Sequence, residues 1–411
     1  MFTRENLIVR PIYLDKLEKY LDKPLVKVLI GMRRVGKSSL MMFLTDKLMK
    51  NGIPKQNLVF INKESLEFDH IRNYGELNAY VLERLKNAKG KKYILIDEIQ
   101  EIIAWEKAVA SLLAEKIGDI IISGSNARML SSELASLLSG RYIEIPVHSL
   151  SFKEFLQFRK KLDPADREEE FRLYLKYGGL PGIHFLSFDD DTIFDYLNSI
   201  LNTVMLKDVV ARHQIRDVSA LERIVKYLMD NIGNVTTAKN IADFFKSQRL
   251  KISTDTVLNY IMHLESALLI KRINRYDLKG RRIMEFYDKP FLTDIGLRNG
   301  LIGFRDKDIN GILENMVCNE LIRRGYRVFV GTLDGLEIDF VAEKQNERIY
   351  LQVCFRLGSP ETVAREFGNL EKIKDNYRKT VVSMDKDFIA DRNGIEHLYL
   401  TDFLLDSESK K

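Results

Sequence analysis

Residues 25–40, LVKVLIGMRRVGKSSL, decide the fold of this chain. The first six of them are a short apolar run that predicts a β-strand, and residues 31–38 (GMRRVGKS) match the phosphate-loop pattern GxxxxGK[ST] at every position. A strand, a glycine loop and a helix in this order form the context that such a loop requires. A chance match in a chain of this length is expected at roughly one in a hundred. The stretch therefore predicts a nucleotide-binding α/β domain.

The residues of this loop have expected roles in binding ATP. Backbone N–H groups that the two glycines turn inward face the phosphate oxygens, and the positive end of the following helix points at the same anion. Lys37 supplies a charge to the β- and γ-phosphates, and the Ser38 hydroxyl is a ligand for Mg²⁺. The residues expected to contact ATP are Gly31, Arg33, Arg34, Gly36, Lys37, Ser38 and Ser39.

Two carboxylates end an apolar strand at residues 93–97 (YILID) and just beyond it. Hydrolysis needs one acid that holds the Mg²⁺ shell and a second that polarises water, and Asp97 suits the first role and Glu98 the second. The alternative is an ordinary buried strand capped by surface acids. The phosphate loop upstream favours the catalytic assignment.

Two further catalytic candidates lie downstream. Asn126, with Ser125 as second choice, follows the next apolar strand and could orient the attacking water, because ligands of doubly wound sheets bind at the carboxyl ends of strands. The alternative is a cap for a helix expected over residues 128–138. Arg141 could reach a γ-phosphate across a subunit interface and neutralise transition-state charge, or it could only complete the C-terminus of that helix.

Apolar runs alternate with helical patterns up to about residue 150. This alternation predicts a doubly wound parallel sheet with helices on both faces. The five expected strands cover residues 25–30, 57–62, 93–97, 119–124 and 142–147.

The composition excludes several classes of protein. The chain has 411 residues, which suits two to four domains, and its two cysteines exclude a disulfide scaffold or a cysteine-rich zinc module. The six histidines show no metal-binding spacing, so no zinc enzyme is expected. The first residues do not resemble a signal peptide, and no apolar run reaches the ~18 residues of a membrane span, which predicts a cytoplasmic protein.

Distinctive motifs are spread along nearly the whole chain. They are GMRRVGKS, ILIDEIQEIIAWEKAV, SGSN, LLSGRYIEIPVHSLSFKEF, YGGLPG, RYDLKG, LTDIGLRN, LENMVCNELIRRGY, EIDFVA and QVCF. With these motifs the chain resembles a family of bacterial and archaeal ATPases of the extended AAA type, whose second half is called domain of unknown function 4143. The resemblance implies ATP binding, a winged helix and a C-terminal fold similar to PD-(D/E)xK nucleases. It also marks Gln100 and Trp105 as family-typical, and we assign Trp105 to core packing.

Together these observations predict a multi-domain α/β chain. The expected domains are a P-loop ATPase core (1–150), a helical lid (151–217), a winged helix (218–300) and a restriction-endonuclease-like α/β domain that has lost activity (301–411). Arg212 or Arg216, at the end of the lid, could sense the γ-phosphate, or both could lie on a solvated helix face.

The winged helix has two interpretations. Residues 220–290 hold 13 Lys or Arg against 8 Asp or Glu, which favours phosphate-bearing partners such as DNA. The expected recognition helix, 253–267, has no Arg or Lys, so we expect non-specific DNA contact, with protein binding as the alternative. The expected DNA contacts are Lys271, Arg272, Arg275, Lys279, Arg281 and Arg282.

A PD-(D/E)xK nuclease would need a helix acid, a strand acid, and an acid and a lysine on the next strand. Glu314 or Glu320 could be the helix acid and Asp339 the strand acid, whereas Gln352 replaces the second acid and Cys354 the lysine. Gln352 could still ligate a metal through its carbonyl. A thiol cannot supply the missing cation, so we expect a domain that does not cleave DNA, in which Cys318 and Cys354 pack as buried hydrophobes.

The sequence therefore predicts an Mg²⁺-dependent ATPase whose nucleotide state changes its grip on DNA or on a protein. One alternative is a metal-dependent DNA nuclease gated by ATP. Another is a signalling switch without turnover that binds a protein partner.

Overall fold

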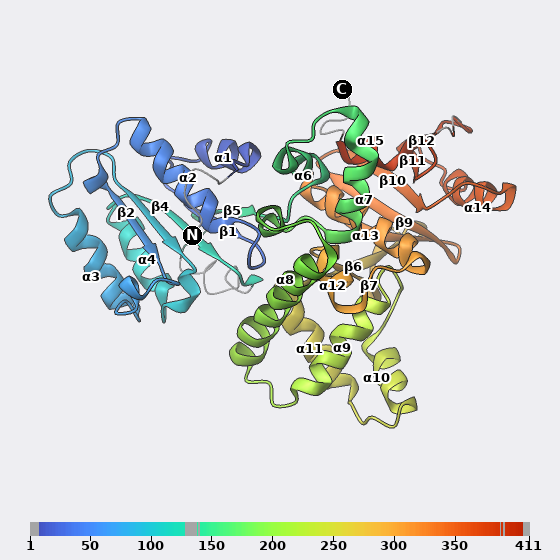
Figure 1. Ribbon diagram of the computed structural model, residues 1–411, viewed down its shortest axis with the longest axis horizontal. Helices are drawn as coiled ribbons and strands as arrows, with labels where there is room; N and C mark the ends of the chain where they lie inside the picture. Colours follow the sequence, from blue (N-terminus) through green and yellow to red (C-terminus); the bar gives the residue numbers. More distant parts are fainter. Residues whose placement is uncertain (1–7, 128–137, 139, 387, 389–390, 406–411) are drawn as a thin grey trace. The chain divides into compact units, whose positions relative to one another are not determined.

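The computed structural model describes residues 8–127, 138, 140–386, 388 and 391–405. The chain divides into two compact units. Figure 1 colours the chain along its sequence, from blue at the N-terminus to red at the C-terminus. The first unit runs to His148 and includes residues 266–268, and the second comprises residues 149–265 together with the chain from 269 onward. The helix expected over 128–138 lies outside the described residues, except for Leu138. Within the described ranges, no helix is long and apolar enough to cross a membrane.

The first unit contains a five-stranded sheet in which all neighbouring strands are parallel. The strand order is β2-β3-β4-β1-β5, and each strand lies within one residue of its predicted bounds (Figure 1). The parallel sheet is thus confirmed. The strands are β1 (Val26–Ile30), β2 (Leu58–Asn62), β3 (Tyr93–Asp97), β4 (Asp119–Gly124) and β5 (Tyr142–Pro146).

Alternate side chains of these strands enter two cores. Val28 of β1 and Ile96 of β3 pack with residues of α3 and α4, and Trp105 belongs to the same core, as predicted. Leu29 and Leu95 point to the other face, where α2 contacts β3 and β4. The helices are α1 (Pro11–Glu18), α2 (Lys37–Lys50), α3 (Tyr74–Leu85) and α4 (Trp105–Ala114).

The second unit begins with helices. They are α6 (Phe152–Arg159), α7 (Arg167–Tyr177), α8 (Asp190–Thr203) with a π-helical continuation (Val204–Ala211), α9 (Val218–Asp230), α10 (Ala238–Ser247) and α11 (Thr254–Ser266). Apolar spacing in the sequence predicts the last three as helices over residues 220–232, 236–246 and 253–267, within two residues of the observed bounds. Strong amphipathic patterns explain that success, because in α9 the buried residues Leu221, Ile224, Val225 and Leu228 recur at helical spacing.

A seven-stranded mixed sheet completes the second unit, with the order β12-β11-β10-β9-β8-β6-β7. Its strands are β6 (Ile270–Asp277), β7 (Arg282–Leu292), β8 (Arg327–Leu333), β9 (Leu336–Lys344), β10 (Glu347–Cys354), β11 (Arg378–Ser383) and β12 (Ile395–Tyr399). Helices α12 (Ile295–Ile302), α13 (Ile309–Arg323), α14 (Pro360–Glu371) and α15 (Leu400–Leu405) accompany it.

This sheet corrects the domain boundary that we expected at residue 300. The β6–β7 hairpin does not stand apart from the C-terminal strands, because β6 pairs with β8 in parallel through Arg275–Val330, Tyr276–Gly331 and Asp277–Thr332. The helices and hairpin of the expected winged helix and the expected nuclease-like strands therefore share one unit. The first boundary falls at 148, close to the expected 150.

Asp294 joins two of the motifs in the second unit. Its carboxylate accepts hydrogen bonds from the N–H groups of Gly179 and Gly296, each at 2.9 Å. Gly179 belongs to the motif YGGLPG and Gly296 to LTDIGLRN. Burial raises the pKa of Asp294 to about 6, although these hydrogen bonds oppose the rise. The two motifs therefore form a buried polar junction.

Candidate nucleotide-binding site

The phosphate loop links the end of β1 to the start of α2. A Cβ atom on Gly31 would lie 2.2 Å from the Val147 carbonyl oxygen, so only glycine fits this close approach of two backbones. Gly36 precedes α2 with φ +99°, which favours glycine. Among the described residues, the N–H groups of residues 36–38 donate to no backbone acceptor. Such a run of free donors at a helix N-terminus forms a cradle for an anion.

Lys37 lies under this loop and is only 4% exposed. Its Nζ donates to the carbonyl oxygens of Gly31 (3.0 Å) and Met32 (3.1 Å) and lies 3.5 Å from Oε1 of Glu98. A phosphate that binds Lys37 has to compete with these three oxygens.

Asp97 ends β3 and is fully buried. One of its oxygens accepts a hydrogen bond from the Ser123 hydroxyl, while the other, Oδ2, has no hydrogen-bond partner among the described residues. Burial raises the pKa of Asp97, and the hydroxyls of Ser123 and Ser38 only partly oppose the rise. An unpartnered carboxylate oxygen near a serine hydroxyl fits the oxygen ligands that Mg²⁺ prefers.

Glu98 adopts a left-handed backbone conformation, with φ 53°, directly after β3. A non-glycine residue in this conformation is uncommon and often belongs to a functional site. Burial by itself raises the pKa of Glu98, but the charges of Lys37 and Arg33 outweigh it and leave the pKa below its ordinary value. The Glu98 carboxylate is therefore ionised at neutral pH.

Gln100 and Ser125 hold the other oxygen of this carboxylate. The Gln100 amide donates to Oε2 of Glu98, and the Ser125 hydroxyl donates to the same atom at 3.1 Å. The family resemblance had marked Gln100 without a role, and its contact with Glu98 now gives it one. Asn126 is buried two residues beyond β4, at the same sheet edge as Asp97 and Glu98.

The two arginines of the loop differ. Arg33 is buried and pairs with Glu64 at 3.0 Å, whereas Arg34 is exposed with φ 67°. Sequence analysis missed Glu64, which lies in the segment after β2 and carries no motif. Its position at the carboxyl end of a strand next to β3 is the only signal that could have found it.

The structure does not bring Arg141 to the phosphate loop of its own chain. It precedes β5, and its carbonyl accepts from the N–H of Val26 at the start of β1. The loop follows the opposite end of β1, about 16 Å away for a five-residue strand. The Arg141 guanidinium donates instead to the Leu138 carbonyl at 3.2 Å. Arg212, in the second unit, pairs with Asp208 at 3.3 Å.

The cations expected to contact DNA fall into two groups. Arg272 pairs with Glu265 (2.7 Å), Lys279 with Asp334 (2.9 Å) and Arg282 with Asp277 (3.8 Å). The other three form no ion pair with a side chain that the structure describes, a set that leaves out the side chains of residues 285–287: they are Lys271, Arg275 and Arg281. The exposed face of α11 carries Leu258 and Met262, both about 40% exposed, and no cation.

The expected nuclease-like residues do come together, around a lysine that sequence analysis missed. Lys289 of β7 is 2% exposed and pairs with Glu314 at 3.0 Å and Glu337 at 2.6 Å. Burial raises the pKa of Asp339 well above its ordinary value, and the neighbouring Glu314 adds to the rise. Glu320, the other candidate for the helix acid, pairs instead with Arg324 at 2.8 Å.

Gln352 is engaged on both sides of its amide. Its oxygen accepts from the Asp339 N–H at 2.7 Å, and its nitrogen donates to Glu366 at 3.1 Å. Among the described residues, no group of three or more His, Cys, Asp or Glu has the geometry of a metal site. Burial raises the pKa of the Cys318 and Cys354 thiols to about 12, as expected of cysteines packed as hydrophobes.

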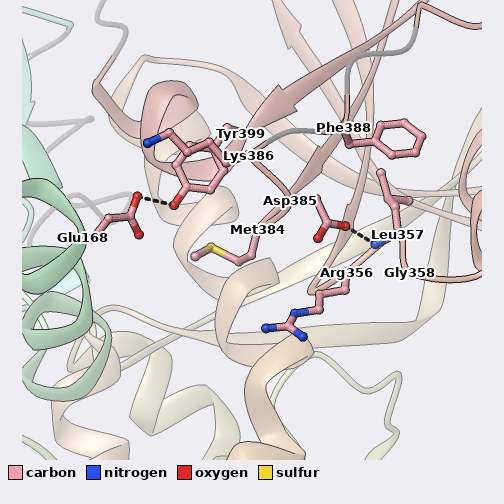
Figure 2. Close-up of a pocket in the computed structure, with 9 residues that line it drawn as sticks. All are labelled: Glu168, Arg356, Leu357, Gly358, Met384, Asp385, Lys386, Phe388 and Tyr399. Carbon is pink, nitrogen blue, oxygen red and sulfur yellow. Dashed lines mark hydrogen bonds between the residues drawn. The ribbon is translucent and has the colours of Figure 1, made fainter.

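In the second unit, a cavity of about 720 Å³ opens where the parallel strands β10, β11 and β12 end (Figure 2). Figure 2 shows both of its acids engaged: the Tyr399 hydroxyl donates to Glu168 at 2.6 Å, and the Leu357 N–H donates to Asp385. Its two cations, Arg356 and Lys386, form no ion pair with a described residue. None of these residues had been singled out from the sequence.

Comparisons with known proteins agree with the phosphate loop. A family model described as an AAA domain matches residues 23–156, and one described as a domain of unknown function (DUF8612) matches residues 168–308. The P-loop NTPase fold of the AAA type is therefore shown for the first unit. The assignments to domain of unknown function 4143 and to a nuclease-like fold stay predictions.

Two relatives match over most of their length. An uncharacterized protein of Haemophilus influenzae is 38% identical over 407 residues, which cover 98% of this chain and 99% of the relative. The uncharacterized protein MJ1544 of Methanocaldococcus jannaschii is 31% identical over 364 residues, 85% of this chain and 79% of the relative. Among solved structures, a Walker-type ATPase of Pyrococcus abyssi, PABY2304, matches 72% of this chain and 97% of its own length, with 15% identity and a TM-score of 0.49. The chain therefore belongs to the same family as the Haemophilus and Methanocaldococcus proteins, and it carries an AAA domain over residues 23–156.

Proposed function

We propose that this protein is an Mg²⁺-dependent ATPase whose nucleotide state controls its binding to DNA or to a protein partner. The observation that carries the proposal is the run of N–H groups without a backbone acceptor at residues 36–38, next to the buried Lys37 side chain and the ionised Glu98. A donor cradle, a cation and a base within one buried site are the parts that hydrolysis of a phosphoanhydride requires.

The roles divide among residues of one sheet edge. The loop N–H groups and Lys37 bind the phosphates, and Ser38 and Asp97 would hold Mg²⁺, which supplies positive charge against the triphosphate. Asp97 has the spare oxygen for this task. Glu98 accepts a proton from the attacking water, and its lowered pKa keeps it able to do so at neutral pH.

Without a bound phosphate, the Lys37 ammonium lies beside the Glu98 carboxylate. When Lys37 turns to a phosphate, Glu98 loses its main counter-charge and becomes a stronger base, since the charge of Lys37 is the largest influence that lowers its pKa. The site would thus activate its base as the substrate binds. Gln100 and Ser125 keep the carboxylate in place meanwhile.

The test compares wild type with Lys37→Ala for ATP binding and hydrolysis. Lys47→Ala is the matched control, because Lys47 lies on the same helix, is exposed and pairs with Glu18. We expect Lys37→Ala to lose binding by at least about tenfold and to lose hydrolysis, and Lys47→Ala to keep both. Normal ATP binding by Lys37→Ala would contradict the site assignment.

The partner is tested by hydrolysis with and without DNA of several forms. Lys271, Arg275 and Arg281 support a DNA contact because none of them pairs with a carboxylate whose side chain the structure describes. Stimulation by DNA would link the two units. Indifference to DNA, with the apolar Leu258 and Met262 exposed on α11, would favour a protein partner or a switch without turnover. Arg141 would act only across an interface between copies.

A metal-dependent nuclease is the second candidate, and one observation favours it. Lys289 supplies, from another strand, the cation that the position of Cys354 lacks, and it contacts the acid Glu314. Both sides of the Gln352 amide, however, are already bonded within the protein. Incubating plasmid with Mg²⁺ or Mn²⁺ and comparing wild type, Asp339→Ala and Lys289→Met decides the matter. Cleavage by wild type alone would support a nuclease, and equal cleavage by all three would identify a contaminant.

A further inference from the structure

Arg10 is a buried cation that no motif singles out. It caps the N-terminus of α1 and is 3% exposed. Its Nη1 donates to the carbonyl oxygen of Val35 in the phosphate loop at 2.9 Å and to that of His148 at 2.8 Å. Its guanidinium carbon lies 4.4 Å from the centre of the Tyr13 ring. Arg10 thus reaches the loop from a segment 25 residues earlier in the chain.

The contact with Val35 determines the direction of a donor in the loop. The carbonyl of Val35 and the N–H of Gly36 belong to one planar trans peptide, so they point in opposite directions. Holding the carbonyl toward Arg10 turns the Gly36 N–H to the other side, and this N–H is one of the unpartnered donors of the cradle. If the peptide turned over, a carbonyl oxygen would face the phosphate and repel it.

Gly36 makes such a rotation easy. Its φ of +99° lies in a region that glycine adopts about as readily as the usual one, so the residue itself does little to hold the peptide. The second partner of Arg10, His148, is anchored separately: its N–H donates to the Tyr13 hydroxyl at 3.1 Å, and the preceding Val147 N–H donates to Ile30 at 2.7 Å. Arg10 therefore joins the anchored His148 carbonyl to a peptide whose orientation Gly36 does little to fix.

We propose that Arg10 is a positioning residue for nucleotide binding, which orients the Gly36 N–H toward the phosphates by holding the Val35 carbonyl. The proposal rests on the proposed ATP site. It predicts that Arg10 affects every ligand whose phosphates occupy the cradle, so affinity for ATP and for ADP falls together when Arg10 is replaced.

The experiment uses the full chain with Arg10→Met, Arg10→Gln and the control Lys16→Met. Lys16 is an exposed cation on the same helix, α1. We expect Arg10→Met to raise the Kd for both ATP and ADP by about tenfold or more, as the loss of a charged hydrogen-bond donor does, and Lys16→Met to stay within about twofold of wild type.

Steady-state kinetics separate positioning from simple loss of folding. A variant that is partly unfolded has fewer active molecules and shows a lower kcat at an unchanged KM, whereas a misdirected N–H raises KM. If Arg10→Met fails to fold, judged by its thermal midpoint without nucleotide, Arg10→Gln carries the test with the same expected rise in KM. A folded Arg10→Met or Arg10→Gln with the wild-type Kd and KM would overturn the proposal. Wild type that binds neither ATP nor ADP would instead overturn the ATP site itself.

Discussion

The Nζ of Lys37 lies 3.5 Å from the carboxylate of Glu98, and both side chains are buried. The cation assigned to the phosphates and the base assigned to the water are therefore paired with each other in this structure. An exchange of partners has to accompany binding of ATP. The pair also explains why Glu98 stays ionised although it is buried.

Glu98→Gln should separate binding from hydrolysis. The amide cannot accept a proton from water, so we expect the hydrolysis rate to fall by about 10²–10⁴-fold. It also removes the negative charge that competes for Lys37, so ATP should bind at least as tightly as to wild type. The measurement is the ATP Kd together with single-turnover hydrolysis. Glu101→Gln, an exposed position three residues on, is the control and should hydrolyse normally. A wild-type rate in Glu98→Gln would remove Glu98 from its role.

Asp97→Asn should abolish the response to Mg²⁺. The amide keeps the size of the side chain but loses the charge of the carboxylate whose Oδ2 is unpartnered. We expect ATP affinity in EDTA to stay within a few-fold of wild type, while the gain in affinity on adding Mg²⁺ disappears. Titration of a fluorescent ATP analogue in EDTA and in Mg²⁺ measures both quantities. A variant that still gains affinity with Mg²⁺ would show that Asp97 does not hold the metal.

The double variant Lys271→Ala, Arg281→Ala tests the hairpin as a DNA contact. The slope of log affinity against log salt is negative, and each lost phosphate contact should reduce its magnitude by about 0.9. The loss of two contacts should therefore reduce the magnitude by about 1.8. Fluorescence anisotropy of a labelled duplex at several salt concentrations gives the slope. Lys239→Ala is the control, because Lys239 on α10 is already paired with Asp243. An unchanged slope in the double variant would exclude the hairpin from DNA binding.

Asp294 should make the stability of the second unit depend on pH. Its pKa is about 6 in the folded chain, against about 3.9 when unfolded, so the folded state binds the proton more tightly. The stability that the protonated form contributes is fully present below about pH 4 and is lost as pH rises through 6. The loss amounts to about 3 kcal/mol in the free energy of unfolding.

The measurement is thermal unfolding of wild type and Asp294→Asn from pH 4 to pH 7. Asparagine cannot titrate and can accept only one of the two N–H hydrogen bonds, so we expect it to be less stable than wild type at low pH. The difference between the two proteins should shrink as pH rises through 6. A difference that stays constant over this range would contradict the assignment.

Most of the fold could be predicted from local patterns in the sequence. The strands of the first unit and helices α9 to α11 were predicted because each is encoded in a short run of apolar spacing, and the phosphate loop because its motif is contiguous. Asp97 and Glu98 were predicted because two carboxylates end an apolar strand downstream of a phosphate loop. Asn126 was predicted because ligands of doubly wound sheets bind at the carboxyl ends of strands. Each of these inferences needs only neighbouring residues and one rule of topology.

The parts that sequence analysis missed depend on contacts between distant segments. Arg10 reaches the carbonyl of His148, 138 residues away, and Lys289 enters the acid cluster from a hairpin that had been assigned to another domain. Nuclease spacing predicts the lysine at the position of Cys354, and no local pattern points to β7. Arg141 had no strand position until the pairing of β1 with β5 placed it at the far edge.

The hydrogen bonds between β6 and β8 limit how this chain can be divided. Cutting it between α12 and α13 would tear one sheet in two and expose a fresh edge on each fragment, which invites aggregation. Neither fragment should be soluble when expressed alone. Exchange of segments between relatives would have to transfer β6 through β12 together.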